Sequence, residues 1–275
     1  MFPILSKEVL AKGVTKFVIK APFVARRVRA GNFVVLRVND HGERIPLTIV
    51  DSDSSQGTIT IIVQTIGKTT KLLSLQEAGG HLLDVAGPLG NPTPIENLGT
   101  VVCIGGGVGT AEVYPIAKAL KKAGNRVITI IGARSKDLVI LEQELKACSD
   151  KVIVATDDGS YGMKGLVTDA LRGYIESNGN LGAVYAIGPI IMMKAVAEFT
   201  RPVGLKTFVS LNPIMMDGTG MCGACRVSIG GTTKFACVDG PEFDGHLVDF
   251  DELIVRNRTY TDLERLSLER FEHAQ

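Results

Sequence analysis

The sequence of 275 residues predicts an α/β plus β fold made of three successive parts. Residues 1–98 contain short β-branched runs separated by Gly, Asp, Asn and Ser, without helix-length gaps, which predicts a small antiparallel β-barrel. In residues 99–209, strand-like runs alternate with helical patterns, which predicts a doubly wound parallel sheet. Residues 210–275 lose this periodicity and form a loop-like segment that carries cysteines and ends in a short helix.

Four runs supply the expected barrel strands: Phe17 to Ile19, Phe33 to Val38, Ile45 to Val50 and Thr58 to Thr65. The fourth run partly alternates between apolar and polar residues, as a half-buried antiparallel strand does. The turn-rich stretch Gly87 to Pro92 then leads to a boundary near residue 98.

The parallel sheet is expected to use four buried runs: Val101 to Ile104, Val127 to Ile131, Val152 to Ala155 and Val184 to Ile187. A helix follows the first run and ends near Gly124, with an apolar face of Val113, Ile116, Ala117 and Leu120. A second helix is expected to begin at Ser135 and to carry Leu138, Leu141 and Leu145 on one face. The charged stretch Tyr260 to Gln275 predicts a last helix, which docks on the rest of the chain or on a partner.

Charge and composition exclude several classes of function. The formal net charge of +1 gives no field that attracts nucleic acid or an anionic lipid surface, and no polybasic stripe is present. The N-terminal residues lack the basic region and the long apolar stretch of a signal peptide. No run reaches the roughly 18–20 apolar residues of a membrane helix. We therefore expect a cytoplasmic protein that binds neither nucleic acid nor a membrane.

Three of the five cysteines lie close together, which in a reducing compartment favours metal or redox chemistry over disulfides. The potential ligands Asp217, Cys222, Cys225 and Cys237 follow the pattern D-x4-C-x2-C-x11-C, which is the plant-type ferredoxin arrangement with aspartate in the first position. The small residues between them allow backbone N–H groups to approach the sulfides of a cluster. The pattern predicts a [2Fe–2S] cluster held by these four residues.

Two alternatives to this ligand set stay open. The three cysteines and one further ligand would also suit a structural zinc ion. Asp217 precedes a glycine, and Asp-Gly is a common turn pair, so its carboxylate could cap a turn while another residue supplies the fourth ligand. The remaining cysteines, Cys103 and Cys148, lie in a strand-like and a helix-like run and are expected to be packing residues.

A glycine run, Gly105 to Gly109, follows the first strand of the expected sheet and precedes a helix. This is the context of a nucleotide-binding turn. The run departs from the usual dinucleotide-binding fingerprint in two ways, because Thr110 replaces the third glycine and Gly132-Ala133-Arg134 stands where an acid usually follows the second strand. The alternative is a structural tight turn without a ligand.

Together, these motifs resemble those of the ferredoxin–NADP reductase superfamily along the whole chain, and in particular the electron-transfer subunits of the class B dihydroorotate dehydrogenase type. The motifs occur in the same order: Arg44-Ile45-Pro46-Leu47-Thr48, Gly67-Lys68-Thr69-Thr70, Gly105 to Thr110, Ile187-Gly188-Pro189 with Met192-Met193, and the cysteine segment. Dihydroorotate-type subunits usually have a fourth cysteine in place of Asp217. The aspartate is similar to the pattern of the small subunits of NADH-dependent reduced ferredoxin:NADP oxidoreductases, also described as sulfide dehydrogenases.

The resemblance implies that the barrel binds FAD. It places Arg44 at the pyrophosphate, Pro46 and Leu47 along the flavin, and Thr48, the candidate catalytic residue, near the reactive edge of the isoalloxazine ring. Gly67, Thr69 and Thr70 would open a helix whose free N–H groups bind the FAD diphosphate. The nicotinamide would approach the flavin past a set of loop residues: Gly105, Gly107, Val108, Gly109, Thr110, Gly188, Pro189 and Met192. Without a ligand, the first two motifs would be an ordinary strand and an ordinary helix N-terminus.

Charge favours NAD(H) over NADP(H). Asp157 and Asp158 occupy the stretch where NADP-specific relatives place a serine and basic residues around the 2′-phosphate. Carboxylates accept hydrogen bonds from ribose hydroxyls but repel a phosphate, by about 1–2 kcal/mol or roughly tenfold in affinity. Arg134 favours the phosphate, and a solvated turn is the alternative for the two aspartates.

The combined hypothesis is an oxidoreductase subunit that passes electrons between NAD(H), FAD and a [2Fe–2S] cluster. No further redox site is evident in the sequence, so the electrons must enter or leave through another chain. The resemblance implies a heterodimer with a larger flavin and [4Fe–4S] subunit, where NADP(H) and ferredoxin react and electrons bifurcate. The alternatives are the electron-transfer subunit of a dihydroorotate dehydrogenase B and a zinc-containing nucleotide-binding module without turnover.

Overall fold

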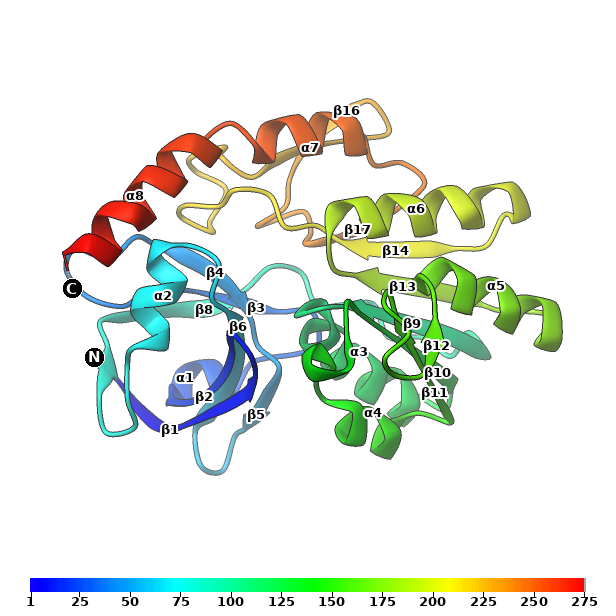
Figure 1. The fold of residues 1–275 in the computed structure, drawn as a ribbon, viewed down its shortest axis with the longest axis horizontal. Coiled ribbons are helices and arrows are strands. Elements are labelled where there is room, and N and C mark those ends of the chain that lie inside the picture. Colours follow the sequence, from blue (N-terminus) through cyan, green and yellow to red (C-terminus); the bar gives the residue numbers. More distant parts are fainter. Residues whose placement is uncertain (275) are drawn as a thin grey trace.

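The computed structural model describes residues 1–274, without the side chain of residue 178. An antiparallel domain, a parallel-sheet domain and a C-terminal segment follow one another along the chain (Figure 1). In this view the first domain lies on the left and the second on the right, and the C-terminal segment runs across both at the top.

The N-terminal domain consists of two antiparallel sheets. One has the order β5-β6-β2-β1-β7 and the other the order β4-β3-β8. Their bounds are β1 (Phe2–Ala11), β2 (Val14–Lys20), β3 (Phe33–Arg37), β4 (Ile45–Thr48), β5 (Asp51–Asp53), β6 (Thr58–Gln64), β7 (His81–Leu82) and β8 (Asp84–Leu89), with helices α1 (Pro22–Ala25) and α2 (Lys68–Ser74). A shared apolar core that includes Phe17, Leu36 and Ile61 lies between the sheets. The antiparallel architecture is confirmed, although backbone hydrogen bonds do not close the strands into one continuous ring.

The sequence analysis did not predict strand β1. It pairs with β2 over most of its ten residues, but only Ile4 and Ala11 of this strand are buried. Because so few of its side chains enter the core, the strand has no alternating apolar pattern to reveal it.

The second domain is a seven-stranded sheet with the order β12-β11-β10-β9-β13-β14-β17. Its strands are β9 (Thr100–Gly106), β10 (Arg126–Ala133), β11 (Lys151–Thr156), β12 (Met163–Lys164), β13 (Ala183–Ile187), β14 (Thr207–Ser210) and β17 (Glu242–Asp244), and its helices are α3 (Gly109–Lys122), α4 (Glu142–Cys148), α5 (Val167–Asn178) and α6 (Ile190–Thr200). All neighbours pair in parallel except β14 and β17. Helices α5 and α6 pack on one face, and α3 and α4 on the other, so the doubly wound sheet is confirmed.

The strand order changes direction at β9. The chain proceeds from β9 to β10 and β11 on one side, and then crosses to β13 and β14 on the other. Gly105 near the end of β9 is in register with Ile187 at the end of β13. Ligands of open α/β sheets bind at such a switch point, beyond the carboxyl ends of the strands.

The prediction of a single helix that begins at Ser135 is wrong. A 3-10 turn, η1 (Lys136–Leu138), is followed by extended backbone and then by α4, and the Ser135 side chain does not cap η1. Ile140 between the two is buried in a cluster with barrel residues, which draws the chain out of helical conformation. Leu141 then adopts φ 56°, in the left-handed region that few residues other than glycine occupy.

The C-terminal segment joins both domains. Its elements are the hairpin β15 (Arg226–Ile229) and β16 (Thr232–Phe235), strand β17, and helices α7 (Phe250–Asn257) and α8 (Thr261–His273); a second 3-10 turn, η2 (Arg201–Val203), follows α6. Strand β17 adds an antiparallel edge to the parallel sheet, while α8 lies beside α2, where Lys71 and Glu272 form an ion pair of 3.6 Å (Figure 1). The final helix is confirmed, and Gln275 lies outside the described residues. No helix within residues 1–274 is long and apolar enough to span a membrane.

Candidate functional site

The first turn of α3 is fixed against the barrel. Ala111 is fully buried in a cluster with Val14, Val50 and Ile62 of the barrel. Two turns later on the same face of the helix, the Lys118 ammonium lies 3.1 Å from the Asp51 carboxylate. These contacts place the glycine run at the N-terminus of α3 beside the barrel.

The glycine run packs closely on the end of β13. A β-carbon at Gly109 would collide with the carbonyl group of Ile187, and one at Gly106 would collide with the Met192 sulfur. Gly107 has φ 56°, which favours glycine. The structure thus brings the two predicted nicotinamide motifs together, residues 105–110 and 188–192, at the switch point of the sheet.

Thr110, in place of the usual third glycine, is accommodated without opening the loop. Its side chain is 1% exposed and lies against the backbone of Gly105, where a β-carbon would have no room. The Thr110 hydroxyl has no hydrogen-bond partner among the described residues. A buried hydroxyl without a partner in a narrow glycine cradle suits a site that is completed by a ligand.

Strand β4 carries the residues predicted to contact the flavin. It pairs with β3 on one side only, and Pro46, Leu47 and Thr48 are all partly exposed. Arg44 precedes the strand and lines a cavity of about 310 Å³.

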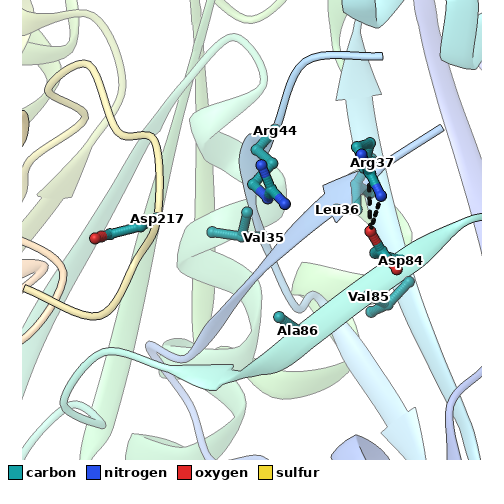
Figure 2. Close-up of a pocket in the computed structure, with 8 residues that line it drawn as sticks. All are labelled: Val35, Leu36, Arg37, Arg44, Asp84, Val85, Ala86 and Asp217. Carbon is teal, nitrogen blue, oxygen red and sulfur yellow. Dashed lines mark hydrogen bonds and ion pairs between the residues drawn. The ribbon is translucent and has the colours of Figure 1, made fainter. Parts of the chain in front are cut away.

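This cavity lies between the three-stranded sheet and the C-terminal segment. Figure 2 shows Arg44 between Asp217 on one side and the pair Arg37–Asp84 on the other. Arg37 Nη2 lies 2.8 Å from the Asp84 carboxylate, which offsets its charge. Arg44 forms no hydrogen bond or ion pair with any described residue, so it is the cation that is free to bind an anion there.

The hydroxyl groups at the start of α2 already have protein partners. The Thr70 hydroxyl accepts a hydrogen bond from the Gly67 N–H (3.0 Å) and donates one to the Gly67 carbonyl (3.0 Å). The Thr69 hydroxyl donates to Glu43 Oε2 at 3.1 Å. Diphosphate binding by these residues stays a prediction, and it would depend on backbone N–H groups or on a rearrangement of Glu43.

The cysteine segment packs on the outer face of β3, next to β4. Phe33 and Val35 point away from the barrel core into a cluster with Met215, Cys225 and Cys237. The backbone at Gly218 is so close that a β-carbon there would come within 2.9 Å of Val35 Cγ2. The candidate cluster ligands therefore pack on β3, which is hydrogen-bonded to the candidate flavin strand β4.

Two of the four predicted cluster ligands are adjacent. The Cys225 and Cys237 sulfurs are 3.2 Å apart and buried, and burial together with the neighbouring Cys225 thiol raises the pKa of Cys237 to about 12. Cys222 is exposed, and its sulfur accepts a hydrogen bond from the Ala224 N–H at 3.5 Å. No group of three or more His, Cys, Asp or Glu in residues 1–274 is placed to hold a metal ion, so the full ligand set stays a prediction.

Asp217 caps the loop in this conformation. Its two carboxylate oxygens accept hydrogen bonds from the Thr219 N–H (2.9 Å) and the Cys222 N–H (3.0 Å), and these bonds lower the pKa of Asp217. An ionised carboxylate retains further lone pairs for a metal. The turn function that was one alternative for Asp217 is therefore present, and it is compatible with ligation.

Comparison with known proteins gives the family. Three family models match in succession: an oxidoreductase FAD-binding domain over residues 1–93, an oxidoreductase NAD-binding domain over 103–198, and the iron–sulfur cluster binding domain of dihydroorotate dehydrogenase B over 212–249. A Thermotoga maritima protein named as a dihydroorotate dehydrogenase B (NAD(+)) electron transfer subunit homolog is 52% identical over 98% of this chain and 94% of the relative. The chain belongs to the family of dihydroorotate dehydrogenase B electron-transfer subunits and their homologues.

Other members and solved structures agree with this assignment. The electron transfer subunit of dihydroorotate dehydrogenase B from Geobacillus thermodenitrificans is 36% identical over 87% of the chain and 94% of that subunit. A solved structure of an NADH-dependent reduced ferredoxin-NADP oxidoreductase, described for flavin-based electron bifurcation, matches with a TM-score of 0.94 and 50% identity over 98% of both chains. This electron-transfer subunit is thus an oxidoreductase subunit with FAD-binding, NAD-binding and iron–sulfur binding domains.

The electron-transfer subunit offers suitable groups for each cofactor. Arg44 is a free cation at the flavin strand, and the glycine cradle at the switch point suits a dinucleotide. Cys237 accepts a hydrogen bond from the Gly220 backbone, and such N–H donors stabilise the thiolates that hold an iron–sulfur cluster.

Asp157 and Asp158 lie just beyond the end of β11 and are exposed. Asp158 Oδ1 accepts hydrogen bonds from the Ser160 N–H (2.9 Å) and hydroxyl (2.7 Å), which lower the pKa of Asp158. The turn expected as the alternative is therefore formed. The role of these carboxylates in nucleotide choice stays a prediction.

Sequence reasoning missed one residue of the site, Glu112. It lies in the first turn of α3, and burial raises its pKa to about 7. The only signal in the sequence was an acid within the apolar first turn of a helix, and nothing indicated that it would face the barrel.

Proposed function

We propose that this subunit transfers electrons between NAD(H), FAD and a [2Fe–2S] cluster. Its partner would be a larger flavin and [4Fe–4S] subunit, in an NADH-dependent reduced ferredoxin:NADP oxidoreductase that bifurcates electrons. The likeness to the solved structure of such an oxidoreductase, over 98% of both chains, carries the proposal. Asp217 in the first ligand position supports the same branch of the family.

Each group of candidate site residues has a separate role in this proposal. Arg44 would bind the FAD pyrophosphate, and Thr48 would orient the reactive edge of the flavin. The loop 105–110 and Gly188-Pro189 would hold the nicotinamide at the switch point, beside Thr48 through the packing of α3 on the barrel. Bound FAD supplies the conversion between the two-electron chemistry of NAD(H) and the one-electron chemistry of an iron–sulfur cluster.

The cluster assignment is tested by Asp217→Ala and Asp217→Cys in the anaerobically purified protein. We expect the alanine variant to lose or destabilise the cluster absorbance and paramagnetic signal at unchanged flavin content, while the cysteine variant keeps the cluster. Asp239→Ala is a matched control, because Asp239 also accepts a backbone N–H in this segment (Phe235, 2.7 Å) without belonging to the proposed ligand set. An unchanged signal in Asp217→Ala would assign the fourth ligand elsewhere.

The second candidate is the electron-transfer subunit of a dihydroorotate dehydrogenase B. The iron–sulfur family model over residues 212–249 and the named relatives support it. The same domain match favours an iron–sulfur cluster over the zinc alternative. Anaerobic purification from native cells distinguishes the two, because the co-eluting subunit would oxidise NADPH and react with ferredoxin in the first case and oxidise dihydroorotate in the second.

A further inference from the structure

Helix α7 is fixed on the parallel-sheet domain. Its residues Phe250 and Leu253 are buried in the largest core cluster of that domain. Asp251 of the same helix forms an ion pair of 2.6 Å with Lys194 of α6. Because the helix is anchored in this way, its last turn, which carries Arg256, has a defined position beside the segment that holds the cysteines.

The last turn of α7 makes two side-chain contacts with the backbone of that segment. Arg256 Nη2 donates a hydrogen bond to the Ala224 carbonyl at 3.3 Å, within the cysteine turn, residues 222–225. Asn257 Nδ2 donates one to the Asn212 carbonyl at 3.0 Å. A helix anchored on the parallel-sheet domain thus holds both the beginning of the segment and its cysteine turn.

The peptide groups of the cysteine turn point their N–H groups and their carbonyls in opposite directions, because a trans peptide is planar. In the unit between Gly223 and Ala224, the N–H donates to the Cys222 sulfur at 3.5 Å. Its carbonyl accepts a hydrogen bond from Arg226 Nη1 at 3.3 Å. In the next unit, the carbonyl is the one that Arg256 binds. A guanidinium group bound to a carbonyl of this turn therefore fixes the direction of an N–H group that can donate to sulfur.

Arg256 also brings a positive charge that no carboxylate offsets. Neither Arg256 nor Arg226 forms an ion pair with a carboxylate within residues 1–274. Arg256 is half-buried, whereas Arg226 is exposed. Water and salt screen an exposed charge more strongly than a half-buried one. Arg256 is therefore the stronger of the two cations at the cysteine turn.

We propose that Arg256 is a positioning residue that raises the reduction potential of the iron–sulfur cluster, because it orients the cysteine turn and places a cation beside it. The inference rests on the proposed function, in which the four predicted ligands hold a [2Fe–2S] cluster. One electron from the flavin adds one negative charge to the cluster and its anionic ligands. A nearby cation and N–H donors to the sulfurs both stabilise this added charge. Arg256 lies beyond residues 212–249, so this cation comes from outside the matched iron–sulfur domain.

The test is a redox titration of the complete, anaerobically purified protein, in which the paramagnetic signal reports the cluster and absorbance reports the flavin. We expect Arg256→Gln to lower the equilibrium constant for cluster reduction by about tenfold, which is ~59 mV for a one-electron couple. Arg256→Lys retains the charge without the planar fork of arginine and should lower the constant by about threefold. The equilibrium constant for flavin reduction in the same samples should change by less than about twofold.

Two further arginines provide matched controls. Arg226→Gln removes the exposed guanidinium group from the same turn, and we expect a smaller decrease that high salt abolishes. Arg258→Gln removes an exposed charge from the end of α7, where the side chain forms no hydrogen bond or ion pair with any described residue. This variant should keep the potential of the wild type.

The outcomes separate the inference from the proposed function on which it rests. A wild-type protein without the signal of a [2Fe–2S] cluster would contradict the proposed function. If Arg256→Gln does not retain iron, the shift in Arg256→Lys decides. A wild-type cluster whose potential is unchanged in the Arg256 variants that retain it would overturn the inference, and so would an equal decrease in Arg258→Gln.

Discussion

Replacement of the buried acid Glu242 by glutamine is expected to stabilise the protein at alkaline pH. Glu242 lies on β17, where Oε1 accepts a hydrogen bond from the Thr93 hydroxyl at 2.6 Å. Its other oxygen, Oε2, is buried and has no partner among the described residues. Burial raises the pKa of Glu242 to about 7, although the Thr93 hydrogen bond lowers it.

The magnitude follows from linkage between proton binding and folding. A pKa of about 7 in the folded state, against an ordinary value of 4.5, corresponds to at most about 3 kcal/mol of free energy of unfolding. The folded state binds this proton more tightly than the unfolded state. The stability is therefore complete below about pH 4.5, declines as pH rises toward 7, and is lost above it. Glutamine is isosteric with the protonated acid and titrates in neither state.

Urea denaturation of the wild type and Glu242→Gln between about pH 4 and pH 8 measures this difference. We expect nearly equal free energies of unfolding at the acidic end and a variant that is more stable by up to ~3 kcal/mol at the alkaline end. Glu269→Gln, on the exposed surface of α8, is the control and should follow the wild type. A difference between wild type and Glu242→Gln that does not vary with pH would refute the reasoning.

Three further perturbations test the cofactor sites. Arg44→Ala should weaken FAD binding by about tenfold or more, measured by flavin fluorescence, because it removes the unpaired cation of the cavity; Arg37→Ala, whose charge Asp84 already offsets, should have less effect. Asp157→Ser combined with Asp158→Arg should shift the ratio of NADH to NADPH affinities toward NADPH by roughly tenfold, and an unchanged ratio would discredit the charge argument. Gly109→Ala should lower nucleotide affinity and stability together, seen by titration and thermal unfolding, because the new methyl group collides with the Ile187 carbonyl.

The local sequence pattern predicted an element correctly where a strand is buried on both faces or where apolar residues follow the period of a helix. The runs at β9, β10 and β13 are almost wholly buried, and such strands appear in the sequence as continuous apolar stretches. The apolar face of α3 matched its period, and Gly124 adopts φ 87° just beyond the helix end. Motif order then gave the three cofactor domains.

The features that the sequence did not predict depend on contacts between residues that are distant in the sequence. Strand β17 gains its partner from β14, and no pattern within Glu242-Phe243-Asp244 marks it as the edge of a parallel sheet. The helix expected at Ser135 is interrupted because Ile140 is buried against the barrel. Glu112 lies near the barrel only because α3 packs on it through Ala111, which no local pattern reports.

The C-terminal segment couples the cluster region to both other domains by backbone contacts rather than by apolar packing alone. The Asn91 N–H donates to the Gly240 carbonyl at 2.7 Å, and the Leu211 N–H donates to the Pro241 carbonyl at 2.9 Å. The first bond comes from the connection after the barrel and the second from the end of β14, and both reach the turn between Cys237 and β17. Because one short turn receives bonds from both domains, displacement of either domain would be transmitted to the segment that carries the candidate ligand Cys237.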